Sequence, residues 1–151
     1  MAERRAGLND RREKGPEMSE QENTQLVKSM FDAFQKGDVP GVLDTLTEDV
    51  EWRLAGPTEV TYAGIRRGRD QVAQVFKVLG EASEFEQFEL QDYIAQGDKV
   101  VVLGHERQRV KATGQTVEND FAMVFTIRDG KIARFRNYED TAAVAAAHRK
   151  A

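Results

Sequence analysis

The chain has 151 residues, 40% of them apolar, a length that suits one compact domain with a buried core. Its formal net charge of −4 excludes the overall positive field that attracts nucleic acid or an anionic membrane. Cysteine is absent, which excludes disulfides and thiolate chemistry. No apolar run approaches the ~20 residues of a membrane helix, and no apolar segment follows the charged N-terminus, so we expect a cytoplasmic protein.

The first segment of the chain mixes both signs of charge and offers few apolar side chains to bury. We therefore predict a flexible charged tail over residues 1–22 and a single folded domain over residues 23–148. A functional arm is the alternative, and it is less favoured because acidic residues interrupt the arginines of this tail.

Helical periodicity dominates the first half of the domain. A helix is predicted from Thr24 to a stop at Gly37, with an apolar face made of Leu26, Val27, Met30, Phe31 and Phe34. A short second helix follows, and its buried side is formed by Val39, Val42, Leu43 and Leu46. A third helix is predicted to begin near Arg69 and to end at Gly80, with Val72, Val75, Phe76 and Leu79 pointing inward.

Strand patterns fill the rest of the chain. Before the third helix, the alternating segment "DVEWRLAG" predicts a half-buried strand, and a loop or short hairpin follows it. After the helix, four strand-like segments are separated by the turns "QGD", "TGQ" and "RDG", and the alanine-rich end predicts a short helix. Helices followed by a meander indicate an α+β fold, with a curved antiparallel sheet whose concave face is covered by the N-terminal helices.

The two faces of each predicted strand can be separated, because side chains alternate along a strand. Along "VVVLGHERQRVK" the outward face is a row of cations formed by His105, Arg107, Arg109 and Lys111. Along "VENDFAMVFTI" the inward face consists of Asn119, Phe121, Met123, Phe125 and Ile127. Along "KIARFRNYE" the outward Arg134 and Arg136 leave an inward face of Ala133, Phe135, Asn137 and Glu139.

A few polar residues interrupt the otherwise apolar inward faces: Glu106, Gln108, Asn119, Asn137 and Glu139. An inward polar group without a partner costs about 1–3 kcal/mol, so their concentration near strand ends indicates the mouth of a ligand pocket. Ordinary hydrogen bonds at a hydrated sheet edge are the alternative. The apolar part of the expected pocket is formed by Met30, Phe34, Trp52, Leu54, Phe76, Phe121 and Met123, for which plain core packing is the alternative.

Three segments carry a family resemblance: "FDAFQKGDVPGVLDTLTEDVEW", "GRDQVAQVF" and "TGQTVENDFAMVFTIRDGKIARFRNYEDTAAV". In sequence and spacing they resemble the SnoaL-like branch of the nuclear transport factor two-like superfamily, over about Thr24 to His148. The superfamily also contains ketosteroid isomerases, polyketide cyclases, scytalone dehydratase and limonene epoxide hydrolase. The resemblance implies a cone-shaped α+β barrel with a deep pocket for a small hydrophobic molecule, commonly in a homodimer. The net charge of −4 and the lack of a long apolar run predict neither nucleic acid nor a membrane as partner.

Catalytic positions of two relatives transfer only in part. The resemblance places the ketosteroid isomerase base at Leu54, its oxyanion-hole tyrosine at Met30 and its oxyanion-hole acid at Met123, so that mechanism is disfavoured. The epoxide hydrolase acids fall at Glu106 and Asp140. Its arginine falls at Gly104, and its water-holding tyrosine and asparagine positions are Trp52 and Leu54.

Glu106 with Asp140 or Glu139 is the candidate catalytic pair. Two inward carboxyls over an apolar floor would raise one pKa, so that one group donates a proton and the other accepts one. This chemistry needs no metal and no cofactor, and the two distant histidines favour no metal site. An ion pair with a neighbouring arginine is the alternative for Glu106, and a helix cap before "TAAVAAAH" is the alternative for Asp140.

Two hypotheses follow from the sequence. In the first, the chain binds a small hydrophobic ligand and catalyses isomerisation, cyclisation, dehydration or epoxide hydrolysis, with Glu106 as acid, Asp140 or Glu139 as base, and Asn119 and Asn137 orienting a ligand oxygen. In the second, the chain is a non-catalytic binding or assembly module whose outer sheet face is the dimer or partner surface.

Overall fold

A computed structural model describes residues 19–149 of the chain, so most of the predicted tail lies outside the described residues. The first helix, α2 (Glu20–Gln35), begins four residues before the predicted Thr24. Ser19 and Glu22 form a reciprocal capping box, in which each side chain accepts from the backbone N–H of the other residue. Residues 19–22 therefore belong to the helix and its cap and not to a tail.

The remaining helices are α3 (Val39–Asp44), α4 (Arg69–Ala82) and the C-terminal α5 (Thr141–His148). The predicted end of the third helix at Gly80 is wrong. Gly80 lies inside α4 with open space around it, and the helix ends only where the backbone of Ser83 becomes extended. Gly37, with φ of +73°, follows α2 as predicted.

The strands are β1 (Leu46–Leu54), β2 (Gly64–Arg67), β3 (Ser83–Gln96), β4 (Lys99–Val110), β5 (Thr116–Arg128) and β6 (Lys131–Tyr138). They form one six-stranded sheet in the order β2-β1-β6-β5-β4-β3. The sheet is mixed and not purely antiparallel, because β1 runs parallel to β6. It is also open, with β2 and β3 as its edges, so the predicted barrel is a curved sheet that does not close.

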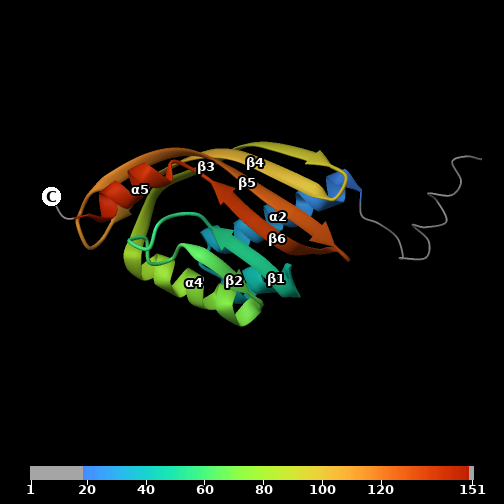
Figure 1. Ribbon diagram of the computed structural model, residues 1–151. Helices are drawn as coiled ribbons and strands as arrows, with labels where there is room; N and C mark the ends of the chain where they lie inside the picture. Colours follow the sequence, from blue (N-terminus) through green and yellow to red (C-terminus); the bar gives the residue numbers. More distant parts are fainter. Residues whose placement is uncertain (1–18, 150–151) are drawn as a thin grey trace, which may run out of the picture.

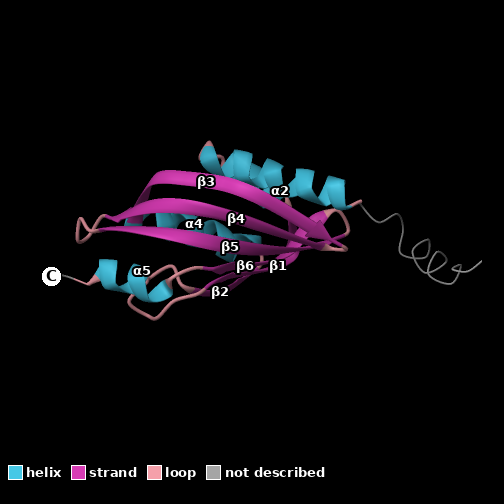
Figure 2. Cartoon of the chain, turned by 90° about the horizontal axis from the view of Figure 1, so that it is seen from above, coloured by secondary structure: helices cyan, strands magenta, loops and turns pink. Residues whose placement is uncertain are grey.

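The sheet curves around the helices, with α2 and α4 on its concave side (Figure 1). The C-terminal α5 lies at the end of the sheet opposite the start of α2 (Figures 1 and 2). The core between the helices and the sheet is apolar and rich in aromatic rings, and Trp52 of β1 stacks on Phe135 of β6 with ring centroids 4.0 Å apart. The predicted α+β architecture, with helices over the concave face, is confirmed.

The predicted face of one strand changes at a bulge. Thr126 and Ile127 of β5 pair with Arg134 and Ile132 of β6, which leaves Ala133 of β6 without a partner. Ile132 is consequently buried and Ala133 only half-buried, contrary to the inward position predicted for Ala133. The alternation predicted for β4 is confirmed, since Glu106 is buried and its neighbour Arg107 is exposed.

The outer face of the sheet pairs the cations of β4 with acids on both neighbouring strands. His105 contacts Asp120 at 2.8 Å, and Arg107 contacts Glu86 at 2.9 Å. These exposed pairs contribute little to stability, although they give the face both signs of charge. Within residues 19–149, no helix combines the length and the apolar character required to span a membrane.

Candidate functional site

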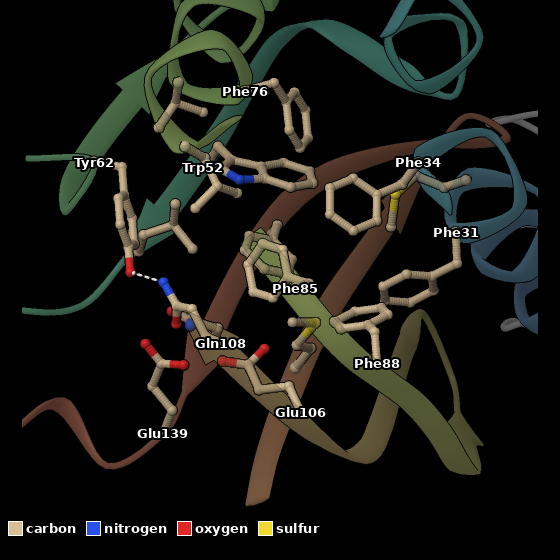
Figure 3. A pocket seen from close by; sticks show the side chains of 17 residues that line it. Phe31, Phe34, Trp52, Tyr62, Phe76, Phe85, Phe88, Glu106, Gln108 and Glu139 are labelled. Atoms are coloured by element: carbon tan, nitrogen blue, oxygen red, sulfur yellow. Dashed lines mark hydrogen bonds between the residues drawn. The ribbon is translucent and has the colours of Figure 1, made fainter. Parts of the chain in front are cut away.

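A cavity of about 60 Å³ opens between the helices and the concave face of the sheet (Figure 3). Predicted ligand-binding residues that line it are Met30, Phe34, Trp52, Leu54, Phe76, Gln108, Met123 and Asn137, and both Glu106 and Glu139 do so as well. Further lining residues are Phe31, Tyr62, Val75, Leu79, Phe85, Phe88 and Phe135. The wall is thus almost entirely apolar, and its polar groups gather at one end.

The polar end of the cavity contains two carboxyl groups that face each other (Figure 3). Glu106 points inward from β4 and is 4% exposed, whereas Glu139 directly follows the last residue of β6. In the part of the chain that the structure describes, no arginine or lysine forms an ion pair with Glu106, so the salt-bridge alternative does not hold. Two acids without a countercharge therefore share an apolar site.

Burial of Glu106 raises the pKa of its carboxyl to about 8, and the negative charge of Glu139 contributes to the rise. The Asn119 amide beside it opposes the shift in part. Burial also raises the pKa of Glu139, while hydrogen bonding to Asn137 and Glu106 lowers it. At neutral pH this arrangement favours one proton shared between the two groups.

Asp140 does not lie where the expected catalytic base would be. Its side-chain Oδ1 accepts a hydrogen bond from the backbone N–H of Ala143 at 3.0 Å and caps α5. The residue is exposed and does not line the cavity. Of the two possibilities left open by the sequence, the structure therefore shows the helix cap.

Asn119 and Phe121 of β5 point inward as predicted but do not line the cavity. Asn119 lies opposite Glu106 on the neighbouring strand, and neither polar atom of its side chain completes a hydrogen bond within the described residues. The ring of Phe121 stacks on Phe88, with centroids 5.5 Å apart, and so supports the cavity wall from behind. Both residues act on the site through a neighbour.

Tyr62 is a lining residue that the sequence did not reveal. It lies in the loop between β1 and β2, where no periodicity marks an inward side, and yet it is only 4% exposed. Its hydroxyl accepts a hydrogen bond from Nε2 of Gln108 at 2.8 Å (Figure 3). Burial raises the pKa of Tyr62 to about 12, so the phenol stays protonated at physiological pH.

The aromatic end of the cavity borders a second hollow of about 170 Å³. Phe34, Phe76, Leu79 and Phe85 line both spaces and so form the partition between them. Phe85 and Phe88 come from β3, in which Glu86 and Gln91 lie at bulges and break the simple alternation. A pattern with a period of two could not assign these rings to the site.

The donor set of the site suits proton transfer to or from an organic molecule. Carboxyl, phenol and amide groups are present, and across residues 19–149 no three His, Asp or Glu side chains gather as a metal site would require. The apolar wall suits rings or alkyl groups, and the polar end suits an oxygen-bearing group.

Comparison with known proteins agrees with this architecture. A family model described as a SnoaL-like domain matches residues 27–135. An uncharacterised protein of Mycobacterium tuberculosis is 27% identical over 128 residues, which are 83% of this chain and 95% of that protein. A solved structure of an NTF2-like protein from Burkholderia xenovorans LB400 is 38% identical, with a TM-score of 0.82, over 88% of this chain and 100% of that chain.

A further similar structure carries a named ligand. TerC, co-crystallised with polyporic acid, is 25% identical to this chain with a TM-score of 0.76, over 84% of this chain and 98% of TerC. These similarities confirm the resemblance predicted from the sequence. The match over residues 27–135 shows that the chain belongs to the SnoaL-like domain family of NTF2-like proteins.

Proposed function

We propose that this protein binds a small hydrophobic organic molecule in its aromatic cavity and catalyses cofactor-free acid/base chemistry on it. The observation that carries the proposal is the pair of facing carboxyls, Glu106 and Glu139, at the polar end of an otherwise apolar cavity. Burying two acids without a countercharge is unfavourable for folding, and perturbed acids in a cavity are frequent at catalytic sites.

The surroundings of the two acids give them different roles in proton transfer. Glu106, whose pKa is raised by burial and by Glu139, holds the shared proton and donates it to a ligand oxygen. Glu139, hydrogen-bonded by Asn137, is the carboxylate that removes a proton from carbon or from water. Isomerisation, cyclisation and dehydration next to a carbonyl group, as well as epoxide hydrolysis, need only these two steps. The co-crystallisation of TerC with polyporic acid supports a small organic ligand.

Exchange of the α protons of 1-indanone in heavy water tests the proposal directly, because it requires only the removal and return of a proton. We expect the wild-type protein to catalyse this exchange and Glu139→Gln to slow it by about 100-fold, the usual size of a general-base effect. Glu106→Gln should slow it by a similar factor. NMR signal loss at the exchanging carbon gives the rates.

Asp140→Asn is the matched control, since asparagine keeps a side-chain oxygen for the helix cap. It should exchange at the wild-type rate. Two outcomes contradict the assignment: rates that Glu106→Gln and Glu139→Gln leave unchanged, or a loss of exchange in Asp140→Asn. The hydrolysis of indene oxide, measured with the same variants, covers the epoxide alternative.

A second function, assembly of a homodimer through the outer sheet face, rests on a different observation. An apolar band crosses this face, formed by Ile94, Val101, Leu103, Ala122, Val124 and Tyr138. Ile94 is 54% exposed and Tyr138 47% exposed, which is unusual for large apolar side chains. The ion pairs beside the band carry both signs of charge, so a second copy of the same face is a complementary partner.

Sedimentation equilibrium tests the dimer. We expect the wild-type protein to sediment as a dimer and Val124→Lys, at the centre of the band, to sediment as a monomer, because a buried lysine would lack a partner. Gln74→Lys on the exposed side of α4 is the control and should remain dimeric. A monomeric wild-type protein, or a dimeric Val124→Lys variant, would refute this interface.

A further inference from the structure

The hydroxyl of Tyr62 is held in a hydrogen-bonded group that no catalytic step described above uses. Gln108, which is 1% exposed, donates from Nε2 to the Tyr62 oxygen at 2.8 Å and to Oγ of Ser83 at 2.6 Å. Tyr62 and Ser83 are each 4% exposed. The three side chains come from the β1–β2 loop, β4 and the start of β3, and so fix one another across the cavity wall.

The direction of these hydrogen bonds leaves the hydroxyl hydrogens of both Tyr62 and Ser83 available. The Gln108 amide nitrogen carries two hydrogens, and both are given to hydroxyl oxygens. Tyr62 is thereby an acceptor toward Gln108, and its own hydrogen must point elsewhere. Ser83 lowers the pKa of Tyr62, as a hydrogen-bond donor to its oxygen does. Within the part of the chain that the structure describes, the Tyr62 hydroxyl therefore donates to no protein acceptor, and it lines the cavity near Glu106 and Glu139.

We propose that Tyr62, oriented by Gln108, donates its hydroxyl hydrogen to an acceptor oxygen of the ligand at the carboxyl end of the cavity. The preferred ligands are then apolar molecules that carry a carbonyl or similar acceptor oxygen at one end. Tyr62 contacts the ligand, whereas Gln108 is a positioning residue that acts through Tyr62.

Electrostatics support a neutral donor at this place. A cation would pair with Glu106 and Glu139 and cancel their mutual repulsion, whereas a protonated phenol leaves the pair as it is. The raised pKa of Tyr62 keeps the hydrogen available across the physiological pH range. A ligand oxygen bound to Tyr62 would also bring the carbon next to it toward the two carboxyls, which lie at the same end of the cavity.

This inference deepens the proposed function and rests on the same cavity, but its test measures binding and not turnover. The probes are 1-indanone and indane, two molecules of similar shape of which only the first has an acceptor oxygen. NMR titration gives the dissociation constant of each for the wild-type protein and its variants. The quantity compared is the ratio of the indane constant to the indanone constant.

We expect Tyr62→Phe to lower this ratio by about fivefold, as the loss of one hydrogen bond predicts, with indane affinity unchanged. Gln108→Leu should lower the ratio in the same direction while Tyr62 is still present. A purely structural role of either residue would weaken both ligands equally and leave the ratio as it was. Tyr93→Phe is the matched control, because it removes a phenol hydroxyl from β3 outside the cavity lining, and it should keep the wild-type ratio.

An unchanged ratio in Tyr62→Phe overturns the inference whatever the turnover is. Conversely, Tyr62→Phe could lower the ratio of dissociation constants fivefold although the wild-type protein catalyses no proton exchange. That result would support Tyr62 as the donor to the ligand oxygen and would refute the proposed catalysis. The two proposals can therefore fail separately.

Discussion

We expect Gly104→Ala to lower the free energy of unfolding by about 3 kcal/mol, the upper part of the range for overpacked cores. Gly104 lies on the inward face of β4 between Leu103 and His105, and an added Cβ would collide with the backbone oxygen of Glu89 and with the ring of Phe121. The backbone oxygen belongs to the neighbouring strand and cannot rotate away. Since Phe121 supports Phe88, the strain would also reach the cavity wall.

Urea denaturation of Gly104→Ala and Gly80→Ala provides the comparison. Gly80 lies in the last turn of α4 with no atom near an added Cβ, so alanine there should stabilise the protein by about 0.5–1 kcal/mol. Shortening Phe121 to leucine in the Gly104→Ala background should recover part of the lost stability. Equal stabilities of the two glycine variants would contradict the steric argument.

The second large effect is a decrease of stability with rising pH that depends on Glu106. A carboxyl with a raised pKa in the folded state holds a proton that the unfolded chain has already lost, so stability falls as pH rises between the two pKa values. For Glu106 this interval runs from the usual 4.5 to about 8. Since one pKa unit corresponds to about 1.4 kcal/mol, we expect a loss of roughly 2–4 kcal/mol between pH 5 and pH 8.5.

Urea midpoints of the wild-type protein and Glu106→Gln across this interval measure the effect. The glutamine variant should lose most of the slope and be the more stable protein at pH 8.5. His105 also has a raised pKa, because Asp120 and Glu118 bind its ring, and it contributes a slope of the same sign in both proteins. Glu139, which shares a proton with Glu106, titrates differently once the Glu106 carboxyl is removed, so the difference between the two proteins measures the Glu106–Glu139 pair. Parallel curves would mean that the pair is not perturbed by folding.

Regular elements of the site could be predicted from the sequence because their residues obey a simple period. The alternation of β4 places Glu106 and Gln108 inward, and the position of Asp140 before an alanine-rich helix indicates a cap. Each of these inferences needs only local geometry. The family resemblance then predicted how these helices and strands are arranged in the overall fold.

The features of the fold and site that the sequence did not predict depend on contacts between distant segments of the chain. Tyr62 lies in a loop, and its hydroxyl is hydrogen-bonded to Gln108, 46 positions later in the chain. No local sequence pattern predicts a hydrogen bond between residues so far apart. The bulges of β3 and β6 move side chains from one face of the sheet to the other. Strict alternation along the strand therefore predicts the wrong face for Ala133 and does not place Phe85 at the cavity. The parallel pairing of β1 with β6 joins segments from opposite halves of the chain, which a meander does not suggest.

That parallel pairing has a consequence for the order in which the protein can assemble. The backbone N–H of Ala55 binds the side chain of Asn137, 82 positions later, and the stack of Trp52 on Phe135 spans a similar length. Contacts of such long sequence separation form late and slow the folding of a domain. During synthesis the cavity therefore cannot form until the last strand has left the ribosome. The only tryptophan of the chain lies in that stack, so its fluorescence reports when the cavity is complete.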